Sequence, residues 1–261
     1  MVPDTNAILL FRFGENRWIQ PIIDGTLSFS CAESFVRQAM KTDNEIQGDR
    51  FEGVFARLKH GDTKISEMEK LLGNDLQKSV DGDYVLLRRR SAMLRPIYCL
   101  YGYKAIDLLH DGGDKIHVGE NVIRHDFDPR MFSGFSGGDW NSNVVANDKR
   151  FAVLTLLPQP FVDRVTIAMA CNKLSYRMGP IDYELEAAET FFIHPTSNYD
   201  ELFCKRPAYA YQHEARICLK DIILSSYFQR VSIYIGRLLD NEYHKEHSPF
   251  YFNIETTLGR K

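Results

Sequence analysis

Three polar side chains at alternate positions of one apolar segment are of types that enzymes use in catalysis. They are Gln212, Glu214 and Arg216, and they lie between Lys205 and Leu219. In an extended strand, side chains two residues apart point to the same face, so these three would form one polar row. A carboxylate in such a row is well placed for chemistry, but an edge strand with a solvated charged face has the same pattern. Both interpretations stay open on this segment alone.

Elements near the start of the chain would position a second set of polar residues. Residues 7–13 are a short, aromatic-rich apolar run, typical of a buried strand, and this run carries one charge, Arg12. An arginine in a core strand needs an anionic partner, which either the protein or a ligand supplies. Residues 26–30 alternate as a strand, with Ser28 and Ser30 on one face. These serines either line a cleft or face water.

Length, composition and charge predict a single domain over residues 1–261. A hydrophobic content of 44% and an aromatic content of 12% can supply a substantial core. The net charge of -3 gives little overall field to attract a polyanion, so nothing here requires a nucleic-acid partner. We interpret the run Arg88-Arg89-Arg90 as the solvated end of a strand, although such a cluster can contact phosphate.

The cysteines and the amino terminus favour a cytoplasmic protein. The five cysteines are widely spaced and odd in number, which suits free thiols in a reducing compartment. No CxxC or HExxH pairing occurs, and the spacing of His117, His125, Asp126 and Asp128 matches no known motif, so we expect no metal site. The first residues lack a basic start followed by an apolar core, and no apolar run approaches membrane-spanning length. We therefore expect no membrane partner.

Residues 111–150 differ in composition from the rest of the chain. Glycine, asparagine, aspartate and serine dominate them, which predicts a flexible loop or insertion that acts as a lid or binds a partner. Apolar patterns elsewhere predict strands at residues 84–87, 96–101, 151–157, 181–186, 231–236 and 250–254, and helices at 15–24 and 160–173.

Several of these landmarks resemble the bacterial and phage proteins grouped as domain of unknown function 2971. That family begins with a short aromatic strand and a helix, then a G-x-L-x-F-S strand and a loop holding an aspartate and a glutamate. The matching residues here are Leu10–Phe13, Trp18–Asp24, Gly25–Ser30, and Asp49 with Glu52. Its later signature is a lysine, an aromatic residue and E-x-E-x-R entering a strand. This chain has Lys205, Tyr209, Tyr211 and Gln212-His213-Glu214-Ala215-Arg216, with glutamine in place of the first glutamate.

More distantly, the same landmarks resemble ADP-ribosyltransferases of the arginine-serine-glutamate class. In that class an arginine on the first strand holds the NAD phosphates, an S-x-S strand scaffolds the nicotinamide pocket, and a Q/E-x-E pair supplies the catalytic glutamate. Arg12, Ser28-Phe29-Ser30 and Gln212-His213-Glu214 occur here in the same order. The resemblance implies catalytic roles for Glu214 and Gln212, with Arg12 and Glu214 on a shared cleft. The cofactor-binding residues that it implies are Arg12, Ser28, Ser30, Tyr209 and Tyr211, with NAD as the substrate.

The chemistry of that class agrees with these residue types. Breaking the nicotinamide–ribose bond develops oxocarbenium character, which a carboxylate stabilises, and an arginine suits pyrophosphate geometry. We expect an α+β (mixed α/β) fold with a split, mostly antiparallel sheet and flanking helices, ADP-ribosyltransferase-like. The expected function is NAD-dependent ADP-ribosyl transfer to a protein or nucleic-acid acceptor, as a toxin or phage-conflict effector. The alternative is a non-catalytic nucleotide-binding or inhibitor protein acting in phage–host conflict. A nuclease or nucleotide hydrolase ranks last, since no clustered metal site is visible.

Overall fold

A computed structural model describes most of the chain. The described residues are 8–42, 49–104, 117–119, 122–126, 151–183, 190–246 and 251–255. They contain both helices and strands, and the strand pairs with a defined register are antiparallel, which confirms the mixed α+β prediction. Most of the loop predicted at residues 111–150 lies outside the described residues, except for two short strands. Among the described helices, none is long and apolar enough to cross a membrane.

The chain divides into two compact units, each assembled from separated segments. Unit 1 holds residues 1–26, 100–165 and 235–261, and unit 2 holds residues 27–99 and 166–234. Strand β6 (Pro96–Lys104) and helix α7 (Pro158–Cys171) each contribute residues to both units. The single domain expected over residues 1–261 stays a prediction.

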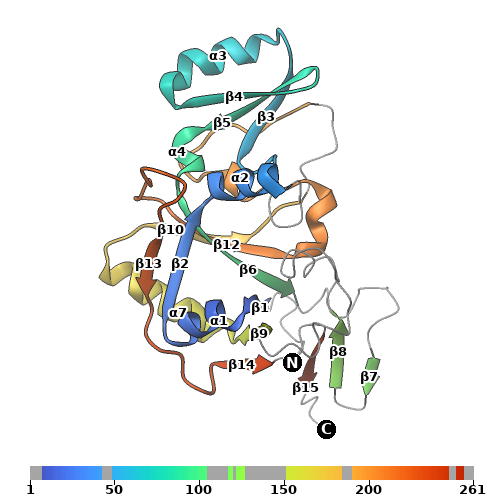
Figure 1. The fold of residues 1–261 in the computed structure, drawn as a ribbon, viewed down its shortest axis with the longest axis vertical. Helices are drawn as coiled ribbons and strands as arrows, with labels where there is room; N and C mark the ends of the chain where they lie inside the picture. The colour runs from blue at the N-terminus through green and yellow to red at the C-terminus, as the bar shows by residue number, and fades with distance from the viewer. Residues whose placement is uncertain are drawn as a thin grey trace, which may run out of the picture. The chain divides into compact units, whose positions relative to one another are not determined.

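Unit 1 is built on the aromatic strand predicted at the start of the chain. Strand β1 lies between the second half of β6 and β9, and β9 also pairs with β14; β8 lies between β7 and β15 (Figure 1). The bounds are β1 (Ile8–Glu15), α1 (Asn16–Ile23), β7 (His117–Gly119), β8 (Val122–Asp126), β9 (Phe151–Leu156), β14 (Tyr243–Glu246) and β15 (Tyr251–Glu255).

The helix predicted at residues 15–24 is α1, and its end depends on a glycine. Ile19, Ile22 and Ile23 are buried along one side, as helical spacing predicts. Gly25 follows with a φ of +93°, and its carbonyl accepts a hydrogen bond of 2.7 Å from the amide of Ile235. A Cβ at this position would overlap the backbone of Gly236, so the site needs glycine both for its conformation and for space.

Unit 2 contains a four-stranded sheet in the order β11-β3-β5-β4. Strands β3, β5 and β4 of this sheet are labelled in Figure 1. One face carries Leu58, Val85 and Leu87, which form a core cluster with Met68 of α3. Its elements are β3 (Val54–Lys59), α3 (Thr63–Leu72), η1 (Gly73–Asp75), β4 (Leu76–Asp81), β5 (Tyr84–Arg89), α4 (Arg90–Met93) and β11 (Phe191–Phe192).

A second group of strands in unit 2 carries the segment singled out in the sequence. Strand β12 lies between β10 and β6, and β2 pairs with both β6 and β13. The remaining elements are β2 (Thr26–Cys31), α2 (Ala32–Thr42), β10 (Tyr176–Pro180), η3 (Asp200–Leu202), η4 (Pro207–Gln212), β12 (Glu214–Leu219) and β13 (Val231–Tyr234). Of the strand predicted at residues 181–186, the structure describes residues 181–183, where Asp182 forms a bridge to Cys204 outside any named strand; residues 184–186 lie outside the described residues.

The run Arg88-Arg89-Arg90 corrects our interpretation of it as a solvated strand end. Arg88 is 6% exposed and Arg89 is 9% exposed, and only Arg90 is exposed to solvent. Arg89 pairs with the buried Glu201 at 2.5 Å, and Arg88 donates to the carbonyl of Glu52 at 3.1 Å. Buried charges need such partners, so Arg88 and Arg89 belong to the interior of unit 2.

Candidate functional site

The segment that ends in Glu214 is not one extended strand. Residues 207–212 form the 3-10 helix η4, which has Pro207 in its first turn, and His213 then adopts the left-handed conformation with a φ of +42°. Strand β12 begins only at Glu214. The predicted polar row is therefore wrong for Gln212, because a proline-started helical turn and a left-handed residue precede the strand. Glu214 and Arg216 do lie two apart on β12.

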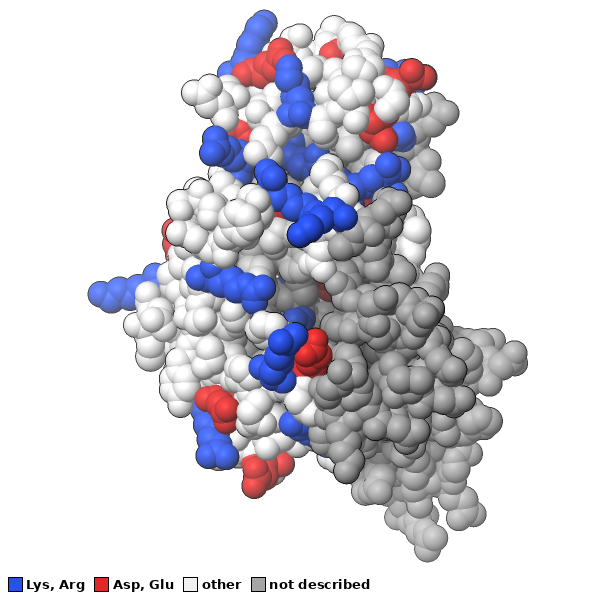
Figure 2. All heavy atoms as spheres, in the orientation of Figure 1, with Lys and Arg blue, Asp and Glu red and all other residues white. Residues whose placement is uncertain are grey.

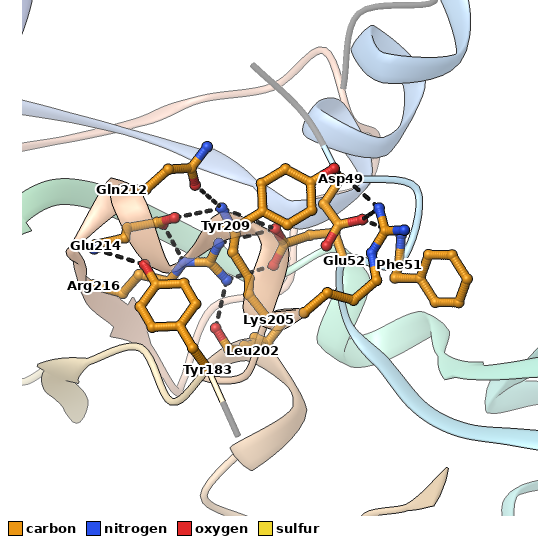
Figure 3. Close-up of polar contacts among 11 residues, drawn as sticks. Asp49, Phe51, Glu52, Tyr183, Leu202, Lys205, Tyr209, Gln212, Glu214 and Arg216 are labelled. Carbon is orange, nitrogen blue, oxygen red and sulfur yellow. Dashed lines mark hydrogen bonds and ion pairs between the residues drawn. The ribbon is translucent and has the colours of Figure 1, made fainter. Parts of the chain in front are cut away.

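Four charged side chains of unit 2 form a buried ionic cluster, which consists of Glu52, Lys205, Glu214 and Arg216 (Figure 3). Arg216 Nε donates to Glu214 Oε1 at 2.5 Å, and its two terminal nitrogens donate to the two oxygens of Glu52. Lys205 Nζ donates to Glu214 Oε2 at 2.5 Å and lies 4.0 Å from Glu52 Oε2. Two cations face two carboxylates, so the ionic cluster is neutral.

These contacts fix the protonation of the ionic cluster. Burial alone would raise the pKa of the Glu214 carboxyl, but Arg216 and Lys205 outweigh it and hold this pKa well below its usual range. For Lys205, burial lowers the pKa, whereas Glu214 and Glu52 raise it above its ordinary value. Glu214 is therefore ionised and Lys205 is protonated at neutral pH.

Neutral groups complete the surroundings of Glu214. Gln212 Oε1 accepts from Lys205 Nζ at 2.9 Å, and the hydroxyl of Tyr183 accepts from the amide of Glu214 at 2.8 Å (Figure 3). Burial, followed by the charge of Glu214, raises the pKa of the Cys99 thiol. That thiol is protonated at neutral pH, so it is a poor nucleophile.

A second ion pair lies beside the ionic cluster, and we call its surroundings the Arg206 site. Arg206 Nη2 donates to Asp49 Oδ1 at 2.8 Å and to the hydroxyl of Tyr209 at 3.0 Å. The guanidinium carbon lies 4.4 Å from the ring centroid of Phe51 and 5.2 Å from that of Tyr209. Asp49 is 1% exposed, and among the described residues its Oδ2 has no hydrogen-bond partner, whereas Oδ1 also accepts from the amide of Phe51. A buried carboxylate oxygen without a donor is unusual in a folded protein.

The structure brings some of the predicted site residues together. Gln212 and Glu214 meet at Lys205, and Tyr209 belongs to the Arg206 site, while Tyr211 is half-buried on η4.

The other predicted site residues lie elsewhere on the chain. On β2, Ser28 is exposed and Ser30 is half-buried, and among the described residues neither serine bonds to the ionic cluster. Arg12 is half-buried on β1 in unit 1, opposite Leu154 of β9. A cleft shared by Arg12 and Glu214 stays a prediction.

Sequence reasoning missed several members of both sites. From the sequence, Asp49 and Glu52 either orient a ligand or a neighbouring arginine or are ordinary turn residues, and Lys205 is one of two candidate ion-pair partners of Glu214. The sequence interpretation gave Arg206 and Phe51 no role. The available signal was chemical: two acids in a loop and two cations near a second acid are complementary charges. Periodicity cannot show that such residues meet, because Glu52 and Arg216 are far apart in the chain.

No protein-family model, curated protein or solved structure matches this chain. The family resemblance drawn from the motifs therefore stays a prediction. Within the described residues, no group of three or more His, Cys, Asp or Glu side chains could hold a metal ion.

Proposed function

We propose that this chain binds a nucleotide, NAD or a related molecule, at the Arg206 site and does so without catalysis. The observation that carries the proposal is the Oδ2 of the buried Asp49, which has no hydrogen-bond partner within the part of the chain that the structure describes. Leaving a buried acceptor without a donor costs about 1–3 kcal/mol, which a ribose hydroxyl or a base amino group would recover by donating to it.

Arg206 supplies the complementary element for a phosphate. Its side chain is 28% exposed, and the rings of Phe51 and Tyr209 hold its guanidinium. A planar guanidinium forms paired, charge-assisted hydrogen bonds with phosphate oxygens. A nucleotide needs an acceptor for its ribose hydroxyl, a donor to its phosphate and aromatic rings nearby. The Arg206 site offers all three.

The ionic cluster favours binding over glycosyl transfer. Stabilising a ribose cation requires a carboxylate whose negative charge is available to the transition state. Both oxygens of Glu214 already accept from cations, one from Arg216 and one from Lys205, and the ionic cluster is neutral. Its charge is therefore largely balanced within the protein.

Calorimetric titration with NAD, ADP-ribose and AMP tests the binding proposal. Arg206→Met and Asp49→Asn should each weaken binding by about ten- to a hundredfold, because each removes a charged contact worth roughly 1.5–3 kcal/mol. Arg37→Met is a matched control, since Arg37 lies on the exposed side of α2 and pairs with Glu33. Equal affinity in the wild type and the Arg206 variant, or no binding by the wild type, would reject the proposal.

ADP-ribosyl transfer is the second candidate, and one contact favours it. Gln212 Oε1 and Glu214 Oε2 accept from the same Lys205 ammonium, so the proposed catalytic pair lies at one place. In the reaction the bond between ribose C1′ and the nicotinamide nitrogen breaks. Nicotinamide leaves with the electron pair, and the acceptor nucleophile bonds to C1′ and loses a proton. For this step Glu214 would have to exchange Lys205 for the ribose.

Labelled NAD incubated with a cell lysate separates the two candidates. If transfer occurs, Glu214→Gln should slow labelling about 100- to 1000-fold with NAD affinity within a few-fold. Gln212→Ala should impair transfer to the acceptor more than NAD hydrolysis, and thermal melting checks that both variants are folded. A wild-type protein that binds NAD but labels nothing supports the non-catalytic proposal.

The proposal also includes the finer expectations from the sequence. These are an ADP-ribosyltransferase-like architecture, a cytoplasmic location and a role in conflict between phage and host. Expression of such an effector in a bacterial host should slow growth or reduce phage plating, and Arg206→Met should reverse the effect. Growth and plating unchanged by the wild type would contradict the conflict role.

A further inference from the structure

Arg95 is a buried cation of unit 2 that pairs with no carboxylate among the described residues. It lies between α4 and β6, and it is 7% exposed. Its Nη1 donates to the backbone carbonyls of Lys220 and Ile222, to the second at 3.4 Å. The buried Nε donates to no described residue, and neither does Nη2.

Such a side chain lacks the two usual ways of stabilising a charge. On the face drawn in Figure 2, Lys and Arg side chains lie at the surface, where water solvates them. Arg95 is too deeply buried for that, and an arginine taken out of water without an anion is costly. A ligand that carries a negative charge would remove this cost.

Two other buried arginines of unit 2 use all three guanidinium nitrogens. Arg216 donates from them to Glu214, Glu52 and a backbone carbonyl. Arg88 donates from Nε and Nη2 to backbone carbonyls and from Nη1 to the hydroxyl of Ser79. Arg95 differs from both, because within the described residues only one of its three nitrogens has an acceptor.

The two remaining nitrogens of Arg95 are the pair that holds a carboxylate elsewhere in this protein. Nε and Nη2 lie on one edge of a guanidinium, and their hydrogens point the same way. In Arg164 this edge donates to the two oxygens of Glu242, each at 3.0 Å. Because Arg95 uses Nη1 for the carbonyls, the edge suited to an oxyanion is the one without an acceptor among the described residues.

The Tyr199 ring keeps the Arg95 guanidinium in its plane. The guanidinium carbon lies 4.0 Å from the ring centroid of Tyr199, and that of Arg89 lies 4.8 Å from the same centroid. Tyr199 has a φ of +57°, which a bulky residue adopts only where surrounding contacts impose it. Tyr199, Lys220 and Ile222 are half-buried, so residues that contact Arg95 themselves reach the solvent.

We propose that Arg95 binds a carboxylate ligand through Nε and Nη2. The neighbouring arginines are already paired, Arg89 with Glu201 and Arg177 with Asp200, so the site supplies one guanidinium edge. Two donors on one edge match the two coplanar oxygens of a carboxylate. A phosphate group presents three oxygens and up to two charges, which several cations bind better than one.

This inference goes beyond the proposed function and does not depend on it. The nucleotide site uses Asp49, Arg206 and Tyr209, whereas the carboxylate site uses Arg95 and Tyr199. Both sites belong to unit 2.

Heteronuclear NMR of the arginine Nε–H groups, titrated with benzoate at fixed ionic strength, tests the inference. The Arg95 signal should shift and saturate, while the Arg164 signal stays in place, because Arg164 already donates to Glu242. Benzamide has the shape of benzoate without its charge and should move the Arg95 signal little. An Arg95 signal that benzoate leaves unchanged, or that both compounds move equally, would overturn the inference.

One substitution separates the guanidinium edge from its charge. Arg95→Lys keeps the positive charge but loses the paired donors, so benzoate should bind about tenfold more weakly. Arg37→Lys makes the same change at an exposed arginine and should bind like the wild type. Equal affinity in the wild type and Arg95→Lys contradicts the inference. Circular dichroism checks the fold, and if Arg95→Lys does not fold, the wild-type titrations with benzoate and benzamide decide.

Further titrations identify the ligand class and its source. Tighter binding of phenyl phosphate than of benzoate would overturn the assignment to a carboxylate. Acetylglycylglycine carries its carboxylate at a peptide end: tighter binding than benzoate supports a peptide as the source, and weaker binding supports a small organic acid. NAD titrated in parallel gives an independent result. Benzoate binding at Arg95 without NAD binding rejects only the nucleotide proposal, and the reverse rejects only this inference.

Discussion

Replacing Arg216 with methionine should severely destabilise unit 2. Arg216 is 1% exposed and donates to Glu214, to both oxygens of Glu52 and to the carbonyl of Leu202. Without it, the two carboxylates of the ionic cluster face only Lys205, so the net charge of the buried cluster changes from 0 to -1. Removing one partner of a buried pair costs about 3–5 kcal/mol, a large part of the roughly 5–15 kcal/mol that holds an ordinary protein folded.

A second substitution should recover part of this loss. Glu52→Leu combined with Arg216→Met leaves Lys205 and Glu214 as a neutral pair at 2.5 Å. The double variant should therefore be more stable than Arg216→Met alone, although it forms fewer hydrogen bonds. The direction of this difference in stability tests the prediction, because two independent losses in the free energy of unfolding would simply add.

Urea unfolding followed by circular dichroism measures both quantities. Arg37→Met is the control, because Arg37 is 53% exposed and its pair with Glu33 should contribute under about 1 kcal/mol. An Arg216→Met protein as stable as the Arg37 variant would show that the buried charges are solvated. A double variant whose loss equals the sum of the two single losses would refute the reasoning from cluster charge.

Three further predictions concern separate parts of the molecule. The depressed pKa of Glu214 contributes stability that is fully present above the ordinary value of about 4.3 and is lost as pH falls towards the folded pKa. Between pH 5 and 3, the free energy of unfolding should therefore fall less in Glu214→Gln than in the wild type, as denaturant unfolding at each pH measures. Gly25→Ala should lower the free energy of unfolding by about 2 kcal/mol or more, because its Cβ would overlap backbone. Gly61→Ala, with a φ of +85° and open space, should cost only about 1 kcal/mol, and equal losses would contradict the overlap. Asp62→Ala should cost about 1 kcal/mol in melting experiments because Asp62 caps α3; an unchanged melting temperature would remove that role.

Local chemistry predicted the elements better than it predicted their partners. The aromatic strand before Gly14 and the helix with Ile19 and Ile22 follow from spacing over one element, so they were predictable. The interruption between η4 and β12 at His213 was not predictable, because a left-handed residue between two polar residues has no periodic pattern in the sequence. The burial of Arg88 and Arg89 was also missed, since their acceptors lie in distant segments.

The candidate site was predicted in its residue types more than in its arrangement. Glu214 was identified, but its pairing with Lys205 and Arg216 depends on tertiary contacts that alternation does not encode. The acid in the loop at Glu52 meets Arg216 across 164 positions of the chain. Complementary charge predicts that such residues need partners without indicating which ones they find.

Because each unit is assembled from separated segments, the two units are completed at different times during synthesis at the ribosome. Unit 2 has all of its residues once Tyr234 has been synthesised, whereas unit 1 waits for the segment that begins at Ile235. Domains tend to fold as their sequence emerges, so unit 2 can complete its interior while β9 of unit 1 still lacks its partner β14. By then strand β1 already has both of its partners, β6 and β9. A nascent chain stalled before residue 235 would thus leave one edge of β9 without its partner strand, and no single cut in the gene would separate the two units.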